Sequence, residues 1–207
     1  MESILLRGLV WETRSGRFQL DRDELSARPG QVCVVVTKQA AIADAFVDVL
    51  VGLAVPLDGS IRVSGESVAS QPAGSRKMAL VPLGGGLFPH MTVEANIAYP
   101  LGPGRSRSYR GKLARYAARR VGMEPFLRRY PPALSADEQV KASLARALCG
   151  EPAVVVFEDR RGHAPCHTAV AAAVRADVAV IVVTDDPSRV EGASEQPAWE
   201  VVESDET

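Results

Sequence analysis

Two neighbouring carboxylates follow an apolar run and are well suited to chemistry. Glu158 and Asp159 come directly after residues 154–157, whose sequence is Val-Val-Val-Phe. Carboxylates at the end of a buried strand can bind a divalent metal ion and accept a proton from an attacking water. The pair therefore predicts either a metal-assisted hydrolytic site or, if no group nearby holds a substrate, the remnant of one.

A run of glycines could bind an anion. Residues 84–86 are three consecutive glycines. Backbone N–H groups of a glycine run can form an anion-binding nest, although a hinge between two parts of a fold is the commoner use of such a run. The sequence leaves both alternatives open.

His163, Cys166 and His167 crowd one segment and include soft metal ligands. A fourth ligand at a recognisable spacing is missing, so a surface loop is the favoured interpretation and no metal site is predicted. The chain has three cysteines, and Cys33 and Cys149 stand in apolar surroundings. A disulfide framework is therefore not expected.

Charge is distributed unevenly along a chain whose net charge is only −1. Residues 105–129 hold one acid, Glu124, and these nine basic residues: Arg105, Arg107, Arg110, Lys112, Arg115, Arg119, Arg120, Arg128 and Arg129. Acids predominate after Arg189, at Glu191, Glu195, Glu200, Glu203, Asp205 and Glu206. The basic stretch is either a face for an anionic or polar partner or a solvated arginine-rich helix. Nucleic acid is not expected as a partner, because Tyr109 and Tyr116 do not by themselves make an interleaved aromatic stacking platform.

The elements that must position these residues follow from length and periodicity. A chain of 207 residues with 46% hydrophobic residues predicts one globular domain, with or without an inserted lobe. Strands are expected at 4–10, 32–36, 60–63, 77–81, 154–157, 178–184 and 199–202, and helices at 41–53, 93–99, 108–121, 136–148 and 167–175. Continuous apolar strands indicate a mostly parallel sheet with flanking helices, an α/β fold. Residues 1–83 and 150–207 would form its core, and residues 84–149 an inserted helical subdomain.

No apolar run is long enough to span a bilayer, and the N-terminal residues do not resemble a cleavable signal. A cytoplasmic protein is therefore expected.

Several segments together resemble the ATP-binding cassette of ABC transporters, a P-loop NTPase-like domain. The resemblance covers residues 4–202. It is carried by Arg28-Pro29-Gly30-Gln31-Val32, Val49-Leu50-Val51-Gly52-Leu53, Pro56-Leu57-Asp58-Gly59-Ser60-Ile61, Leu87-Phe88-Pro89-His90-Met91-Thr92-Val93, Tyr130-Pro131, Leu134-Ser135, Leu144-Ala145-Arg146-Ala147-Leu148 and Glu151-Pro152. The segment Leu87 to Val93 resembles importer-type cassettes in particular.

The residues matching the phosphate loop differ from the GxxxxGK[ST] pattern. The glycine positions are Thr37 and Ile42, the lysine position is Ala43 and the hydroxyl position is Asp44. A loop without its glycines and lysine loses the groups that wrap phosphate, and a carboxylate would repel it. We therefore expect no normal ATP binding and no cofactor. Under the alternative of a weak ATPase, Lys38 would replace the lysine and Mg-ATP would bind.

Other nucleotide-contacting motifs of the family are altered as well. The glutamine of the Q-loop is matched by Leu83, and the switch histidine by Asp185. The signature motif is matched by Leu134 and then Ser135, Ala136, Asp137 and Glu138, and the Walker B pair appears in exchanged order as Glu158 and Asp159. The interval from Glu158 to Asp185 is also shorter than is usual in the family. These residues are vestigial in this interpretation, and the chain is not expected to be an enzyme.

In the family, the segment matched by Leu87, Phe88, Pro89, His90 and Met91 borders the groove that receives a permease helix, although these residues could equally be core. Its retention beside altered catalytic motifs implies a pseudo-ATPase subunit. Such a subunit would be peripheral on the inner face of the membrane, docked on a permease and paired with a competent cassette or a second copy. The alternatives are a soluble regulatory or scaffold protein and the weak ATPase described above.

Overall fold

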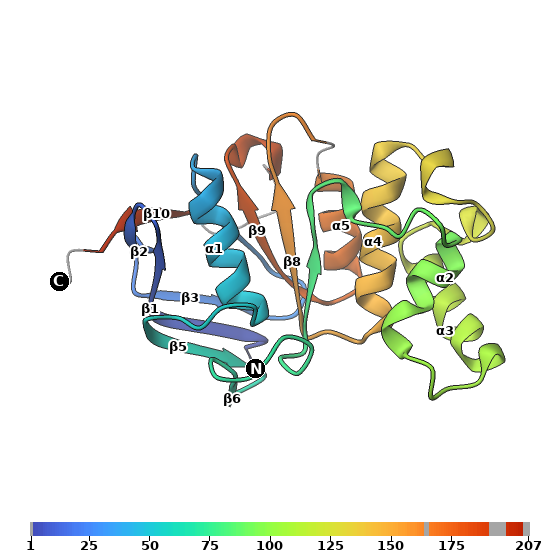
Figure 1. Cartoon of the computed structure of the whole chain (residues 1–207), viewed down its shortest axis with the longest axis horizontal. Helices are drawn as coiled ribbons and strands as arrows, with labels where there is room; N and C mark the ends of the chain where they lie inside the picture. The colour runs from blue at the N-terminus through green and yellow to red at the C-terminus, as the bar shows by residue number, and fades with distance from the viewer. Residues whose placement is uncertain (1, 164–165, 191–197, 205–207) are drawn as a thin grey trace.

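The structure of the protein, a computed structural model, describes residues 2–163, 166–190 and 198–204 (Figure 1). The tail acids Glu191, Glu195, Asp205 and Glu206 lie outside the described residues. The strands are β1 (Ile4–Thr13), β2 (Gly16–Leu20), β3 (Glu24–Ala27), β4 (Val32–Val36), β5 (Asp58–Val63), β6 (Glu66–Ser67), β7 (Met78–Val81), β8 (Val154–Asp159), β9 (Ala179–Thr184) and β10 (Trp199–Glu203).

Helices lie on both faces of the sheet and in a lobe beside it. The α-helices are α1 (Ala40–Val51), α2 (Val93–Ala98), α3 (Arg107–Arg120), α4 (Ala136–Cys149) and α5 (His167–Arg175). Short 3₁₀ helices are η1 (Leu83–Gly85), η2 (Tyr99–Leu101), η3 (Glu124–Phe126), η4 (Pro131–Ala133) and η5 (Pro187–Val190). The α/β fold with an inserted helical region is confirmed.

The sheet is mixed, with order β6-β5-β1-β2-β10-β4-β9-β8-β7 and β3 paired to β1. The predicted parallel arrangement holds within the series β10, β4, β9, β8 and β7, in which each strand runs parallel to the next. The N-terminal strands instead form an antiparallel part. This part was not expected, because β2, β3 and β6 are short or polar. Strand β10 lies between the two parts, antiparallel to β2 and parallel to β4.

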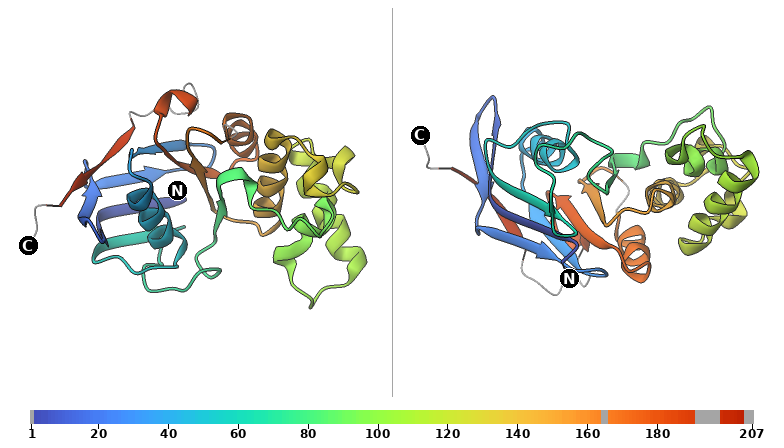
Figure 2. Two further views of the ribbon diagram at one scale, coloured as in Figure 1. Left: turned by 45° about the horizontal axis from the view of Figure 1, so that its top comes forward. Right: turned by 90° about the horizontal axis from the view of Figure 1, so that it is seen from below.

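Alternation along the parallel strands builds two hydrophobic cores, one on each face of the sheet. Val32 and Val34 of β4 point to the face covered by α4 and α5. Cys33 and Val35 point to the opposite face, where α1 and the antiparallel strands pack. Both faces of these strands are buried, as a continuous apolar sequence predicts for parallel strands. Figure 2 shows the helical lobe beside this layered core.

Helix α1 ends two residues before the predicted position 53. Gly52 adopts a left-handed conformation with φ of 89° and donates its N–H to the Asp48 carbonyl, which ends the helix. A Cβ at Gly52 would lie 2.7 Å from Nε of Arg76. That arginine is 2% exposed and its guanidinium donates to the carbonyls of Val49 and Leu50 at the last turn of α1. The glycine thus leaves room for a buried arginine that satisfies the helix end.

Three helices, α2, α3 and α4, pack together in the lobe (Figure 1). In the described part of the chain, no helix combines the length and apolar character needed to cross a bilayer.

Candidate functional site

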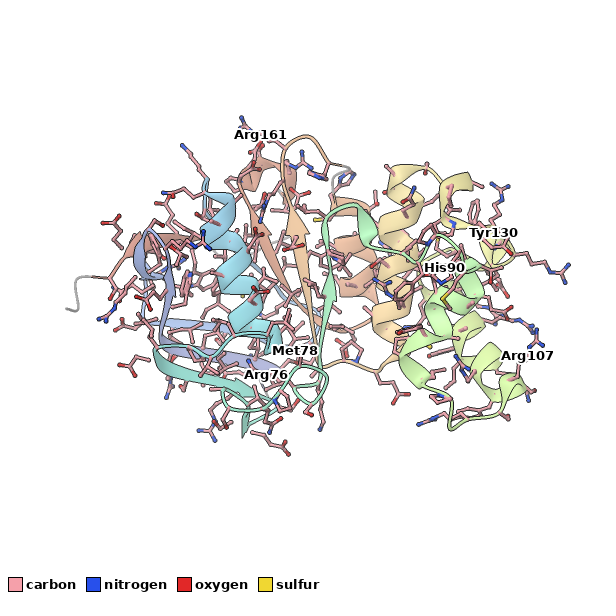
Figure 3. All side chains as sticks on the ribbon, in the orientation of Figure 1. Arg76, Met78, His90, Arg107, Tyr130 and Arg161 are labelled. Carbon is pink, nitrogen blue, oxygen red and sulfur yellow. The ribbon has the colours of Figure 1, made fainter. Side chains whose placement is uncertain are left out.

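The carboxyl ends of β4, β8 and β9 meet at one edge of the sheet, at the top of Figure 1. Ligands of open α/β sheets bind at this edge, in the crevice beyond the strand ends. The predicted residues Thr37, Asp44, Glu158, Asp159 and Asp185 all come from this region. Arg161 also projects here (Figure 3).

The loop after β4 is short and adopts ordinary backbone angles. No residue between positions 37 and 44 has a positive φ. Thr37 donates its N–H to the carbonyl of Thr184 at 3.0 Å, and the N–H groups of Ile42 and Ala43 both point to the Gln39 carbonyl. These three donors are therefore used within the chain.

Ile42 and Ala43 lie inside α1 and are 3% and 4% exposed. Their side chains belong to the core that packs α1 on the sheet. The chain enters the helix at Ala40, so Ile42 is a helical core residue and not part of an open loop. Without glycine the segment continues as helix, the conformation that its alanines favour.

Asp44, at the hydroxyl position of the phosphate-loop pattern, forms an ion pair with Arg160. The same guanidinium donates to the carbonyl of Ala40 at 3.3 Å, so it links the first turn of α1 to the end of β8. Arg160 is 18% exposed in its side chain and Asp44 57%. This ion pair therefore places the Arg160 cation beside the start of α1.

Asp159 is buried, with 1% of its surface exposed. Arg189 approaches it with two nitrogens, Nε at 2.6 Å from Oδ2 and Nη2 at 3.0 Å from Oδ1. The Thr184 hydroxyl donates to Oδ2 and the Cys166 N–H to Oδ1, both at 3.2 Å. Four donors thus occupy a carboxylate that was a candidate metal ligand.

Glu158 contacts the segment that matches the Q-loop. Its Oε2 accepts a hydrogen bond from the N–H of Leu83 at 3.2 Å. Burial raises the pKa of Glu158 above its ordinary value, against the opposing effects of this hydrogen bond and of the nearby Arg160 cation. The structure therefore brings Leu83 and Glu158 together, with a backbone N–H in place of a side-chain amide.

Asp185, at the switch position, accepts the N–H of Arg161 at 3.1 and 3.3 Å. The Arg161 side chain forms an ion pair with Asp186 at 3.2 Å. Hydrogen bonds from Ser188, opposed by some desolvation, hold the pKa of Asp186 below its usual range. These contacts tie the segment after β8 to the end of β9.

The residues matching the signature motif serve as a helix start. Ser135 caps α4 and forms a capping box with Glu138: each side chain bonds the other's backbone N–H, at 3.2 and 2.7 Å. Asp137 accepts from the Thr168 hydroxyl and pairs with Lys141 at 2.7 Å. Desolvation opposes its ionisation, but these two partners hold the pKa of Asp137 below its ordinary value. Ala136 is the first residue of the helix.

Gly84, Gly85 and Gly86 connect β7 to the lobe and are called the glycine strap below. All three have backbone conformations that favour glycine. Gly84, Gly85 and Gly86 have φ values of 65°, 81° and 52°. A Cβ at Gly85 would lie 2.6 Å from the Gln139 carbonyl oxygen of α4. The Arg146 guanidinium donates to the carbonyls of Gly85 and Gly86, which fastens the strap to α4.

The predicted docking segment, residues 87–91, lies around the side chain of Asn96, which is fully buried. Its side-chain amide accepts the Phe88 N–H at 2.8 Å and donates to the carbonyls of Phe88, Met91 and Thr92. This clamp fixes the backbone of the segment. The Phe88 ring lies 4.6 Å from the Tyr99 ring.

A groove of about 640 Å³ lies between the edge strand β7 and the lobe, lined in part by Gly86, Phe88, Tyr99 and Arg146. Of the predicted docking residues, Phe88 faces this groove, whereas Leu87 packs against the core. Pro89 and His90 are exposed and Met91 is half-buried. His90 and Tyr130 both lie on the lobe (Figure 3).

Metal-ligating side chains do not gather anywhere in the described residues. Cys166 is buried, and burial raises the pKa of its thiol to about 12, far from the thiolate form that metals bind. His163 contributes its backbone carbonyl to Arg189. The N–H of Cys166 bonds Asp159 directly, and the carbonyl of His163 bonds the arginine that pairs with Asp159.

The sequence did not identify the arginines that complete this edge. Arg160 and Arg161 immediately follow the carboxylate pair, and this adjacency of opposite charges was an available signal. Arg189 stands 30 positions after Asp159, and no spacing pattern connects them. Lys38 lines a separate hollow of about 350 Å³ together with Glu200 and Glu203.

Comparisons with known proteins agree with this geometry. The family model described as ABC transporter matches residues 19–159. The chain is 32% identical to the molybdate/tungstate import ATP-binding protein WtpC of Archaeoglobus fulgidus over 148 residues, covering 72% of this chain and 60% of that protein. It is 31% identical to the sulfate/thiosulfate import ATP-binding protein CysA 2 of Chromobacterium violaceum over 147 residues, covering 70% of this chain and 40% of that protein. The chain thus spans 40–60% of the length of these relatives.

Solved structures share the fold. The cbiO1 protein of Clostridium perfringens superposes with a TM-score of 0.73 at 17% identity, covering 91% of this chain and 80% of that one. A nucleotide-free ATP-binding cassette from an ABC transporter gives 0.74 at 15% identity, covering 94% and 86%. Because the family model matches more than half of the chain, the chain belongs to the ABC transporter family, as an ATP-binding cassette.

Proposed function

We propose that the chain is a degenerate cassette subunit that docks on a membrane permease, or on a partner cassette, without normal ATP binding or hydrolysis. One observation carries the proposal. The carboxylates Asp44 and Asp159 each bind an arginine of the same chain, Arg160 and Arg189, at the edge where a cassette would bind nucleotide and metal.

The residues at this edge do not fit Mg-ATP. A phosphate needs free N–H donors and a cation, but the N–H groups of Thr37, Ile42 and Ala43 are bonded within the chain and the lysine position is a buried alanine. A magnesium ion needs free carboxylate oxygens, and both oxygens of Asp159 accept bonds from the chain. We infer that internal ion pairs take over the structural role of the nucleotide.

The groove beside β7 supports docking on a permease. Its lining includes an aromatic side chain, Tyr99, which is 54% exposed. Relatives of the chain are import ATP-binding proteins, and cbiO1 is described as part of an ABC transporter complex. A permease of an importer is therefore the proposed partner, and the inner face of the membrane the proposed location. Helix α5, which lies in the shortened interval before Asp185, has nine residues, and this argues against the standard dimer of two cassettes.

Nucleotide binding is tested by thermal unfolding of the purified chain with and without millimolar Mg-ATP. The expected result is an unchanged Tm, because a ligand raises Tm only by binding the folded state. Saturable stabilisation that Lys38→Ala abolishes would overturn the proposal in favour of a weak ATPase.

Permease docking is tested by capture of the tagged chain from gently solubilised native cells, followed by mass spectrometry. We expect recovery of a multi-span permease, and loss of that permease with Tyr99→Ala. Tyr130→Ala is the matched control, since Tyr130 is 52% exposed in the same lobe and lies outside the groove. Recovery of soluble proteins alone would favour the regulatory or scaffold alternative.

A further inference from the structure

We propose that a basic groove on the helical lobe binds the headgroups of anionic phospholipids at the membrane surface. The groove lies between α2 and the first half of α3 and has a volume of about 990 Å³. The inference rests on the proposed function, since it places the lobe close to a bilayer. It adds a second membrane contact that does not involve the permease.

Positive charge dominates the lining of this groove. Glu94 is the one acid among the lining residues, and the basic ones are Arg105, Arg107, Arg110, Lys112 and Arg115. Glu94 forms an ion pair with Arg115 at 3.5 Å. The other four basic side chains form no ion pair with a described residue. Like charges gathered without counter-ions create a local positive potential that an anionic surface would neutralise.

The start of α3 adds to this potential. Ser106 caps the helix by accepting the Tyr109 N–H, and the first turn contains no acidic residue. The partial positive charge at the helix N-terminus is therefore not offset by a local carboxylate. Arg107 and Ser108 of this turn line the groove.

Arg110 shows that the cationic lining is held in place. Its Nη2 donates to the Ala98 carbonyl at 3.4 Å, while its buried Nε has no hydrogen-bond partner in the structure. A buried donor left unpaired costs free energy that an approaching anion could reduce by electrostatic attraction.

Composition and position favour lipid over other polyanions. Tyr109 is 46% exposed and its hydroxyl accepts from Arg105 at 3.1 Å, so tyrosine and arginine stand together as they do at membrane interfaces. The Arg105 guanidinium lies 5.3 Å from the centre of the Tyr109 ring. That ring is thus engaged by arginine, whereas single-stranded nucleic acid needs free stacking faces.

The basic groove adjoins the docking groove. Ala98 lines the basic groove, and its chain neighbours Tyr99 and Pro100 line the docking groove beside β7. A permease seated in the docking groove would therefore bring the basic groove near the lipid around it. Arg107 projects at the far end of the lobe (Figure 3).

Vesicle co-sedimentation of the purified full chain tests the inference without a permease. The probe is phosphatidylcholine vesicles containing about one third phosphatidylglycerol, with pure phosphatidylcholine vesicles as the neutral reference. We expect binding to the anionic vesicles only, weakened by added salt, and at least about tenfold weaker for Arg107→Glu with Lys112→Glu. Both side chains are exposed and outside any ion pair among the described residues, so these changes should leave folding intact, as circular dichroism would verify.

Arg14→Glu with Arg28→Glu is the matched control, since it changes the net charge equally at exposed positions of the antiparallel part of the fold. Full vesicle binding by this control is expected. Equal loss in both double variants, equal binding to neutral vesicles, or binding of polyglutamate or RNA without vesicle binding would each overturn the inference. Because no permease is present, these results do not depend on the capture experiment that tests docking.

Discussion

At the scale of single residues, Asp159 is the one carboxylate that is fully buried among the described residues. A buried charge is tolerated only when it is paired and hydrogen-bonded, and Arg189 supplies the pairing. Arg189→Met should therefore lower the free energy of unfolding by about 3–5 kcal/mol, measured by urea denaturation.

Arg161→Met is the control for this change. Its ion pair with Asp186 is exposed, with 73% of the arginine side chain accessible, so solvent screening makes its loss nearly neutral. Similar destabilisation by the two substitutions would show that the buried pair has no special role.

Glu158 offers a pH-dependent prediction. Its pKa in the folded state lies above the ordinary value of 4.5, chiefly because of burial. The folded state then holds the proton more tightly, so stability falls as pH rises through this raised pKa and stays lower above it. Glu158→Gln keeps an acceptor for Leu83 and removes the charge. We expect its Tm to exceed that of the unsubstituted chain by a few degrees at neutral pH and to converge with it in acid.

A Glu158→Gln curve parallel to that of the unsubstituted chain from acid to neutral pH would contradict the prediction.

At the scale of elements, the glycine strap allows a matched comparison. Gly84 and Gly85 both have positive φ, but a Cβ at Gly84 meets nothing within 4 Å, whereas one at Gly85 would lie 2.6 Å from a carbonyl of α4. Gly84→Ala should cost roughly 1–2 kcal/mol for the left-handed backbone alone. Gly85→Ala should cost clearly more in urea denaturation, because α4 must also move. Equal costs would mean that the strap does not pack tightly on α4.

Helices and buried strands were largely predictable, and the reason lies in their sequences. Strands β4, β8 and β9 are continuous apolar runs, and Ser135 with Glu138 marks the start of α4. Strand β2 reads Gly-Arg-Phe-Gln-Leu, with polar residues alternating, and it forms only by pairing with β1 and β10. Its pairing with β1 is a local hairpin, but its pairing with β10 joins strands far apart in the sequence, and no local pattern reveals that second pairing.

The candidate site was predictable only in part. The carboxylates Glu158 and Asp159 follow an apolar strand, a local signal. Their counter-ions carry no such local signal. Arg189 follows β9 in the sequence and reaches Asp159 only through tertiary packing. The sequence thus predicted the carboxylates of this edge more readily than the arginines that pair with them.

At the scale of the whole molecule, β10 connects the two parts of the sheet, and Trp199 anchors it. The indole is 3% exposed, donates from Nε1 to the Glu24 carbonyl at 3.1 Å, and lies 4.2 Å beneath the Arg22 guanidinium. Trp199→Ala should lower the free energy of unfolding by about 3–5 kcal/mol in urea denaturation.

Val202→Ala on the same strand is the control, since Val202 is 37% exposed. A small effect of both substitutions would mean that the antiparallel and parallel parts hold together without β10.

The position of β10 also determines when the sheet can close during protein synthesis. Strands β2 and β4 are made early, but the strand that separates them is contributed by residues 199–203. Until the ribosome has released those residues, both strands present unpaired backbone groups to each other and to other nascent chains. The growing polypeptide therefore needs a chaperone most in the interval between the synthesis of β2 and β4 and the synthesis of β10.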